Sequence, residues 1–246
     1  MFAFRDTRAA ISVAFTDRHG GVSGGPYASL NLGGRSDDPE AVEANLAILA
    51  RAVSVDGRPP PRLVRVRQVH GAEVLLVDDE FLGSGEASSV EADALVSDRR
   101  EVALMVRAAD CVPVLLADAE AGVVGAAHAG RPGMVAGVVP NTIREMRALG
   151  AQRLVAWIGP HVCGACYEVP EQMRAEVAAA VPESYAHTSW GSPSVDLGSG
   201  VRAQLEREGV AVVDAARCTM QDENLFSYRR QGAWSGRMAG LVWVRG

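Results

Sequence analysis

The sequence predicts an α/β fold with mixed β-sheets, formed by one domain that spans residues 1–246. A chain of 246 residues is within the usual size of one such domain, and its 48% apolar and 22% charged residues are typical of globular proteins. Strand-like apolar runs follow one another between residues 63 and 127 without a long helix between them. This order favours an antiparallel or mixed sheet over a doubly wound parallel sheet.

Turn residues and apolar periodicity predict the first elements of the chain. Ile11–Phe15 is a β-rich run, and the glycine-rich segment His19–Gly34 that follows it is unsuited to a regular element. Asp37 or Asp38 is expected to cap a helix that has Pro39 in its first turn and apolar residues at helical spacing after it.

The rest of the chain alternates between strand-like and helix-like patterns. The proline-rich stretch Asp56–Leu63 is predicted to be a connector that is too short for a domain linker. Further strands are expected at Leu63–Val69, Val74–Val77, Ala94–Val96, Val102–Val106, Val112–Leu116, Val123–Ala127, Leu154–Ile158, Val210–Val213 and Leu241–Val244. Helices are expected at Met134–Leu149, which Pro140 weakens, at Glu171–Val181 and at Val201–Glu208.

The composition excludes several classes of function. The chain has 24 basic and 30 acidic residues, and this balance argues against a broad surface for nucleic acid or anionic membranes. All of its basic residues are arginines, so lysine Schiff bases, pyridoxal-phosphate enzymes and the P-loop lysine are excluded. The N-terminus does not resemble a secretory signal and no apolar run is long enough to cross a membrane, so we expect a cytoplasmic protein.

Three side chains suited to metal binding or covalent catalysis stand at the ends of strand-like runs. His70 ends one run, Cys111 precedes the next, and His128 ends another only 17 residues later, a separation typical of a hairpin. Each alone is more often structural. Together, two histidines and a cysteine with an open fourth position form a known type of catalytic zinc site. The same residues also fit a Cys111 nucleophile with His128 as its base.

A second cysteine motif, Cys163-x-x-Cys166, follows an expected strand. A redox dithiol needs a helix N-terminus to lower the pKa of one thiol, and this pair lies at the exit from a strand into a loop. A zinc finger needs a second cysteine pair, which Cys218 alone does not supply. We therefore expect the pair to be structural.

Two segments contain arginines that are candidates for anion binding. Arg131 lies in a glycine-flanked turn between His128 and an expected helix, where backbone N–H groups and one arginine can hold a phosphate. Arg229 follows Tyr228 in a polar segment before the last strand, where anion binding and a solvated turn are equally expected.

In combination, these motifs resemble the laccase-domain family of YfiH-type purine nucleoside phosphorylases, formerly named multicopper polyphenol oxidoreductases. The blocks that carry the resemblance run over nearly the whole chain and read FTDRHGGVSGGPYASLNLG, RQVHGAEV, EADALVSD, ADCVPVLLAD, AAHAGRPG, WIGPHVCGACYEV and CTMQDENLFSYRR with GRMAGLVW. The resemblance implies a four-layer α/β/β/α fold and a zinc site made by His70, Cys111 and His128, with copper as the alternative occupant. It also implies phosphorolysis of adenosine, inosine and methylthioadenosine, with an accessory adenosine deaminase activity.

One block departs from the family pattern, which commonly reads HAGWRG. Here Arg131 stands in place of the tryptophan and Pro132 in place of the arginine, so the role of that arginine moves to Arg131 or the substrate lies differently. Arg131, Arg229, Asn31 and Gln68 are the candidates for contacts with the nucleoside or the phosphate. We expect no nucleic-acid or membrane partner.

The sequence excludes a multicopper oxidase. Such an enzyme needs several copper ions held largely by His-x-His pairs, and this chain has five histidines and no such pair.

Two other function classes remain open. A cysteine-type hydrolase or amidase would use Cys111 and His128, with His70 as the orienting residue. This second reading includes editing of cell-wall precursors, and the implied fold is similar to that of the cytotoxic necrotizing factor deamidase. A non-catalytic binding module is the third reading.

Overall fold

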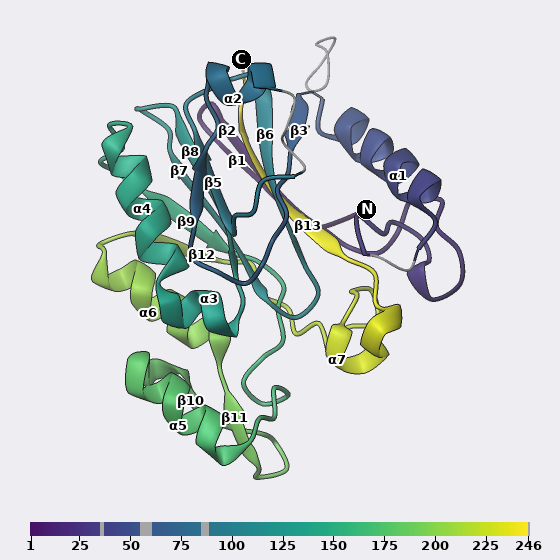
Figure 1. Ribbon diagram of the computed structural model, residues 1–246, viewed down its shortest axis with the longest axis vertical. Coiled ribbons are helices and arrows are strands. Elements are labelled where there is room, and N and C mark those ends of the chain that lie inside the picture. The colour runs from purple at the N-terminus through teal and green to yellow at the C-terminus, as the bar shows by residue number, and fades with distance from the viewer. Residues whose placement is uncertain (35–36, 55–60, 85–88, 246) are drawn as a thin grey trace.

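The computed structural model describes residues 1–34, 37–54, 61–84 and 89–245, and two β-sheets lie face to face at its centre (Figure 1). The five-stranded sheet has the order β1 (Phe2–Arg8), β2 (Ile11–Thr16), β13 (Met238–Val244), β6 (Val102–Ala108) and β3 (Arg62–Val64). The six-stranded sheet has the order β12 (Ala211–Asp214), β9 (Val155–Ile158), β7 (Val112–Asp118), β8 (Val123–Ala129), β5 (Ala94–Ser97) and β4 (Val74–Leu76). Each sheet combines parallel and antiparallel neighbours, which confirms the predicted mixed sheets.

Helices cover the outer faces of the two sheets. The helix α1 (Pro39–Ala52) packs on the five-stranded sheet. The outer face of the six-stranded sheet is covered by α3 (Arg131–Ala136), α4 (Val138–Ala148) and α6 (Leu197–Arg207), and α5 (Glu171–Ala180) lies beyond α3, against a small hairpin rather than on the sheet. The arrangement is therefore the α/β/β/α order of four layers that the family resemblance implies. The short helices are α2 (Asp79–Ser84), α7 (Tyr228–Gln231), η1 (Gly25–Tyr27), η2 (Pro182–Ser184) and η3 (Gly232–Trp234), and a separate hairpin consists of β10 (Tyr185–His187) and β11 (Pro193–Val195).

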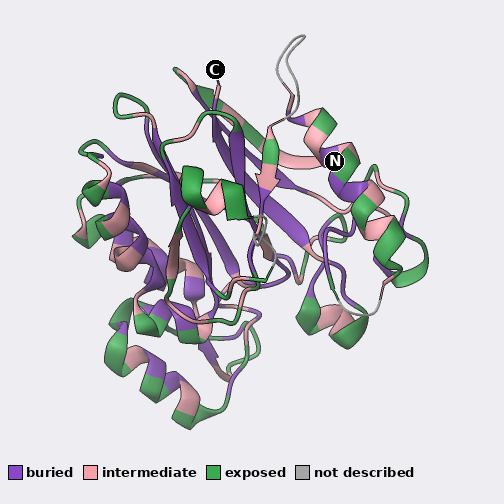
Figure 2. Cartoon of the chain, turned by 45° about the horizontal axis from the view of Figure 1, so that its top comes forward, coloured by how far each residue is buried: buried purple, intermediate pink, exposed green. Residues whose placement is uncertain are grey.

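An apolar interior lies between the sheets, where both strand faces are buried (Figure 2). Phe15 of the five-stranded sheet meets Leu115 and Trp157 of the six-stranded sheet there, and all three side chains are almost fully buried. Because strands β5 to β8 are buried on both faces, they read as continuous apolar runs rather than as alternating ones. That pattern explains why the central strands are predictable from the sequence.

Several predicted boundaries differ from the structure. The single helix expected at Met134–Leu149 is wrong, because Gly137 adopts a left-handed conformation with φ of 85° and separates α3 from α4. Pro140 then lies in the first turn of α4, where its missing N–H leaves no helical bond unmade. The strand expected at Leu63–Val69 is present only as the short β3.

The N-terminal boundary of α1 is confirmed, since Asp38 caps it by accepting a hydrogen bond of 3.0 Å from the N–H of Glu40. The helix expected at Val201–Glu208 begins earlier, at Leu197, where Asp196 supplies the cap. Of the predicted connector Asp56–Leu63, residues 56–60 lie outside the described residues. In the described part of the chain, no helix has both the length and the apolar character that a membrane crossing requires.

Candidate functional site

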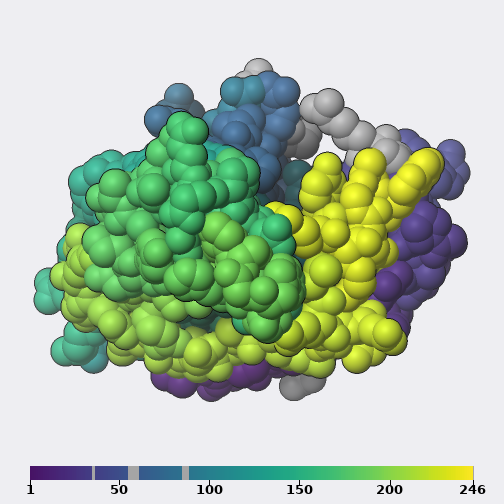
Figure 3. Space-filling view, turned by 90° about the horizontal axis from the view of Figure 1, so that it is seen from below, coloured from purple at the N-terminus to yellow at the C-terminus, as the bar shows by residue number. Residues whose placement is uncertain are grey.

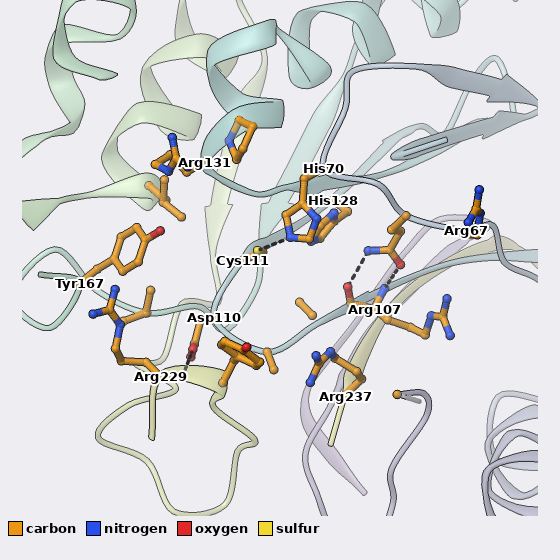
Figure 4. Close-up of a pocket in the computed structure, with 18 residues that line it drawn as sticks. Arg67, His70, Arg107, Asp110, Cys111, His128, Arg131, Tyr167, Arg229 and Arg237 are labelled. Carbon is orange, nitrogen blue, oxygen red and sulfur yellow. Dashed lines mark hydrogen bonds between the residues drawn. The ribbon is translucent and has the colours of Figure 1, made fainter. Parts of the chain in front are cut away.

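The three predicted ligands converge at one edge of the six-stranded sheet (Figure 4). Antiparallel pairing places Pro113 of β7 opposite His128 of β8, so Cys111, two residues earlier, lies beside that histidine. The ligand atoms of His70, Cys111 and His128 lie within 4.8 Å of one another, and Nε2 of His70 is 3.7 Å from Sγ of Cys111. His128 is buried, Cys111 is half-buried and His70 is exposed, so the cluster opens on the His70 side.

Asp93 holds both histidines in place and is itself fully buried. Its carboxylate accepts a hydrogen bond of 2.8 Å from Nδ1 of His128, which leaves Nε2 of that ring for the cluster. The same carboxylate accepts hydrogen bonds from the backbone N–H groups of Val69, His70 and Gly71 at 3.1, 3.0 and 2.6 Å. A carboxylate behind a histidine ligand is the usual orienting partner in protein metal sites, because it fixes the tautomer and the direction of the ring.

The backbone around the cluster adopts conformations that are rare for residues with side chains. His70 has φ of 62° and Asp110 has φ of 92°. Such conformations cost on the order of 1–3 kcal/mol each and persist where neighbours fix them, often at functional sites. Asp110 is held by Thr219 Oγ1 and by the N–H of Arg229, both at 2.6 Å.

Gly130 allows the closest approach within the cluster. A Cβ atom at this position would lie 2.7 Å from Cδ2 of His70 and 3.2 Å from Sγ of Cys111. Any larger residue at position 130, just after β8, would therefore collide with His70 and Cys111, so the close approach of these two side chains requires glycine there.

Close contact within the cluster changes the pKa values of Cys111 and His128. Burial by itself raises the pKa of the Cys111 thiol, but the charge of His128 and hydrogen bonds from both histidines outweigh it and lower the pKa to about 6. Burial by itself lowers the pKa of His128, but the Cys111 thiolate and Asp93 outweigh it and raise the pKa to about 9. The free protein therefore favours a thiolate at Cys111, which is the form of cysteine that binds metals or attacks carbonyl groups.

A cavity of about 860 Å³ lies in front of the cluster and is strongly positive. Five arginines line it, and Figure 4 shows Arg131 and Arg229 on one side of Cys111 and Arg107 and Arg237 on the other, with Arg67 further out. Within the described residues, Arg107, Arg131, Arg229 and Arg237 form no ion pair with a carboxylate. A cavity of this volume fits a small organic molecule, and the uncompensated positive charge favours an anionic group.

The four predicted substrate candidates divide into two pairs. Arg131 and Arg229 line the cavity. Gln68 also lines it, but both atoms of its amide bind the backbone of Arg107, at 2.7 and 2.9 Å. Asn31 is fully buried outside the cavity lining, and its Oδ1 accepts a hydrogen bond of 2.8 Å from the N–H of Arg237. Gln68 and Asn31 thus position two of the arginines, and their direct contact with a substrate stays a prediction.

Sequence reasoning missed Asp93, Arg107 and Arg237. Arg107 is the only charged residue in the apolar run of β6, which is the signal that could have identified it. Asp93 becomes a partner of His128 only because β5 pairs with β8, so that Ala94 lies opposite Ala127. Arg237 resembles a solvated residue ahead of the last strand, and no signal in the sequence marks it.

The pair Cys163 and Cys166 lies outside the residues that line the cavity. Replacing both with serine is therefore expected to leave turnover within a few-fold of the wild type. Steady-state kinetics of the double variant would check this. A loss of about 100-fold with the fold intact is typical of a group that acts in the chemistry and would contradict the prediction.

Comparisons with known proteins identify the family of the chain. Residues 12–245 match the family described as multi-copper polyphenol oxidoreductase laccase. The chain is 53% identical to purine nucleoside phosphorylase SCO2081 of Streptomyces coelicolor, over 99% of this chain and 100% of that protein. It is 35% identical to purine nucleoside phosphorylase YfiH of Escherichia coli, over 95% of this chain and 94% of that protein.

Solved structures show the same fold. The structure of protein NMB0706 from Neisseria meningitidis has a TM-score of 0.84 and 36% identity, and the match covers 97% of this chain and 96% of that one. The structure of YlmD from Geobacillus stearothermophilus has a TM-score of 0.86 and 31% identity, and the match covers 97% and 93%. The chain therefore belongs to this family of laccase-like, YfiH-type proteins.

Proposed function

We propose that the protein is a zinc-dependent purine nucleoside phosphorylase that cleaves adenosine, inosine and methylthioadenosine in the cytoplasm, with an accessory adenosine deaminase activity. The observation that carries this proposal is the His70, Cys111 and His128 cluster, which opens into a cavity lined by arginines. The names of the curated relatives support phosphorolysis of purine nucleosides.

The donor set fits zinc. Two imidazoles and one thiolate are the ligand types that Zn²⁺ prefers, and Asp93 supplies the orienting carboxylate behind one imidazole. When bound, zinc supplies a Lewis acid at the floor of the cavity. Copper is the alternative occupant, because imidazole and thiolate donors suit it as well.

A multicopper site does not fit the described histidines. His70 and His128 line the cavity. The other rings bind elsewhere, His19 to Asn224, His161 to the carbonyl of Gly159, and His187 to Arg174. The arrangement supports one mononuclear centre at this edge of the sheet.

In the proposed reaction, an oxygen of inorganic phosphate forms a bond to C1′ of the ribose while the bond from C1′ to the purine nitrogen breaks. The bonding electron pair goes to the purine nitrogen, which takes up a proton, and the transition state resembles an oxocarbenium ion. Arg131 and Arg229 would hold the phosphate, since a guanidinium binds two phosphate oxygens at once. Tyr167 also lines the cavity, and burial, aided by the Cys111 charge, raises the pKa of its phenol, so its proton is retained for donation.

A cysteine-type hydrolase or amidase, including an editing enzyme for cell-wall precursors, is the second candidate. The favouring observation is the thiolate of Cys111 beside a histidine that a buried carboxylate orients. His70, which the sequence suggested as the orienting residue, does not hold the His128 ring at Nδ1. Asp93 occupies that place.

Metal analysis separates the two candidates. We expect His128→Ala to lower the zinc content by one equivalent per chain, and His187→Ala, a histidine bound to Arg174, to leave it unchanged. In the wild type, Cys111 should resist alkylation at neutral pH until a chelator is added, because a bound thiolate is not free to react. The hydrolase would be favoured if His128→Ala keeps the zinc content of the wild type and if Cys111 of the wild type is alkylated without a chelator.

A further inference from the structure

A second group of thiols lies outside the cavity lining, where two distant segments of the chain meet. The Sγ atoms of Cys163, Cys166 and Cys218 lie within 4.8 Å of one another, and all three thiols are free. Cys166 is buried and the other two are half-buried, so one side of the cluster reaches solvent. Nothing in the sequence indicates that Cys218 lies next to Cys163 and Cys166, but the fold places the three thiols together.

Two tight turns present the sulfur atoms to each other. The carbonyl of Cys163 accepts hydrogen bonds from the N–H groups of Cys166 and Tyr167, at 2.9 and 3.0 Å. The carbonyl of Cys218 likewise accepts from Gln221 and Asp222, at 3.2 and 2.9 Å.

The turns also contact each other directly through sulfur. The N–H of Cys163 donates to Sγ of Cys218 at 3.5 Å, and Nε2 of Gln221 donates to Sγ of Cys166 at 3.4 Å. N–H groups directed at sulfur stabilise a thiolate once a metal has displaced the thiol proton.

The cluster lies directly behind the wall of the cavity. Tyr167, which follows Cys166, lines the cavity. Thr219, which follows Cys218, donates a hydrogen bond of 2.6 Å to Asp110, next to Cys111. Figure 3 shows the two segments against each other on one face of the molecule, with the residues near 160–190 in green and those near 220–237 in yellow. A bond between the turns would thus fix two walls of the cavity relative to each other.

We propose that Cys163, Cys166 and Cys218 bind a second Zn²⁺ ion, separate from the site at His70, Cys111 and His128. The three cysteines supply three of the four ligands that structural zinc takes, and a water molecule from the solvent side would complete the tetrahedron. Zinc–sulfur bonds of about 2.3 Å bring tetrahedral ligands to about 3.8 Å from one another, so the cluster needs only a small contraction. Binding releases the thiol protons to solvent and ties the turn at residues 163–168 to the turn at residues 217–222.

Zinc stoichiometry of the full chain tests this proposal. Protein purified under reducing conditions without chelator should contain two equivalents of zinc per chain. The Cys163→Ser, Cys166→Ser double variant and the His128→Ala variant should each contain one, and their combination none. In Cd²⁺-substituted protein, the double variant should lose most of the ultraviolet thiolate-to-metal absorption, whereas His128→Ala should lose only the smaller part. The thermal midpoint of the double variant should fall, and added Zn²⁺ should not restore it.

Three results would overturn the proposal. The first is a wild type that holds one equivalent of zinc which His128→Ala removes entirely. The second is a double variant that still holds two equivalents. The third is a disulfide between any two of these cysteines in the reduced-purified protein, found by mass spectrometry, which would make the cluster a redox pair. If the double variant does not fold, the zinc content of Cys218→Ser and of the wild type tests the proposal instead. Neither measurement depends on the nucleoside activity.

Discussion

Replacing Asp93 with asparagine is expected to lower the affinity for zinc by about 10- to 100-fold, with a parallel fall in turnover. The carboxylate accepts four N–H groups, one from the His128 ring and three from the backbone around His70. Asparagine offers one acceptor oxygen, and its amide N–H₂ would face these donors. At least one buried donor then loses its partner, which costs about 1–3 kcal/mol. Competition with a chromophoric chelator measures the affinity, and steady-state kinetics measures the turnover.

Asp118→Asn is the matched control for this change. Asp118 is also a buried carboxylate that accepts four N–H groups, from Glu120, Ala121, Gln152 and Arg153, and it lies at the far end of β7. We expect this control to lose stability while it keeps its zinc affinity. Equal zinc affinity in Asp93→Asn and the wild type would show that Asp93 does not orient a ligand.

Replacing Arg131 with alanine is expected to raise the apparent KM for phosphate by about 10- to 150-fold, the equivalent of 1.5–3 kcal/mol for a charge-assisted contact. Arg131 is half-buried in the cavity wall, three residues after His128, and forms no ion pair within the described residues. Since the chain has no lysine, arginine is the only side chain that supplies a fixed positive charge there. The KM for the nucleoside should change much less. Kinetics with phosphate varied at saturating nucleoside measures the effect.

Two other arginine variants make the phosphate result specific. Arg144→Ala removes an exposed guanidinium on α4 that binds Asn141 and Glu145, and the phosphate constant should not change. Arg229→Ala tests the second side of the cavity, where Arg229 donates to the carbonyl of Glu168 and lies 5.0 Å from the Tyr167 ring centroid. If Arg229→Ala raises the apparent KM for phosphate and Arg131→Ala does not, the turn after His128 has only a structural role and the phosphate binds elsewhere in the cavity.

The central strands and the three members of the candidate metal site were predictable from related signals. Strands buried on both faces read as apolar runs, and Cys111 and His128 lie at the ends of two such runs with side chains that are unusual there. His70 follows an apolar run of the sequence in which only the short β3 forms a strand. The strand β1 escaped prediction because it lies at the edge of its sheet and its last four residues, Arg5–Arg8, are all polar, so it has neither an apolar run nor an alternating pattern. The hairpin of β10 and β11 has three residues in each strand, which is too short for periodicity to show.

The rest of the site depends on pairings between distant segments. Asp93 meets His128 through the pairing of β5 with β8, and the N–H of His128 donates to the carbonyl of Asp93 at 2.7 Å. Cys218 reaches the Cys163 turn through a parallel bridge to His161, in which the N–H of Thr219 donates to the carbonyl of His161 at 3.0 Å. Neither contact has a local signature, because hydrophobic periodicity specifies which face of a strand is buried but not which strand lies next to it.

Analysis of the products, with phosphorus NMR for ribose 1-phosphate and chromatography for the free base and free ribose, tests the central proposal most directly. The protein is incubated with adenosine or inosine, with and without inorganic phosphate, and the Cys111→Ser variant serves as the comparison. Cleavage that requires phosphate and yields ribose 1-phosphate and free base in equal amounts, and that is lost in Cys111→Ser, is the predicted result. Release of free ribose without a requirement for phosphate, or no cleavage of either nucleoside by zinc-loaded protein, would contradict the proposed phosphorylase.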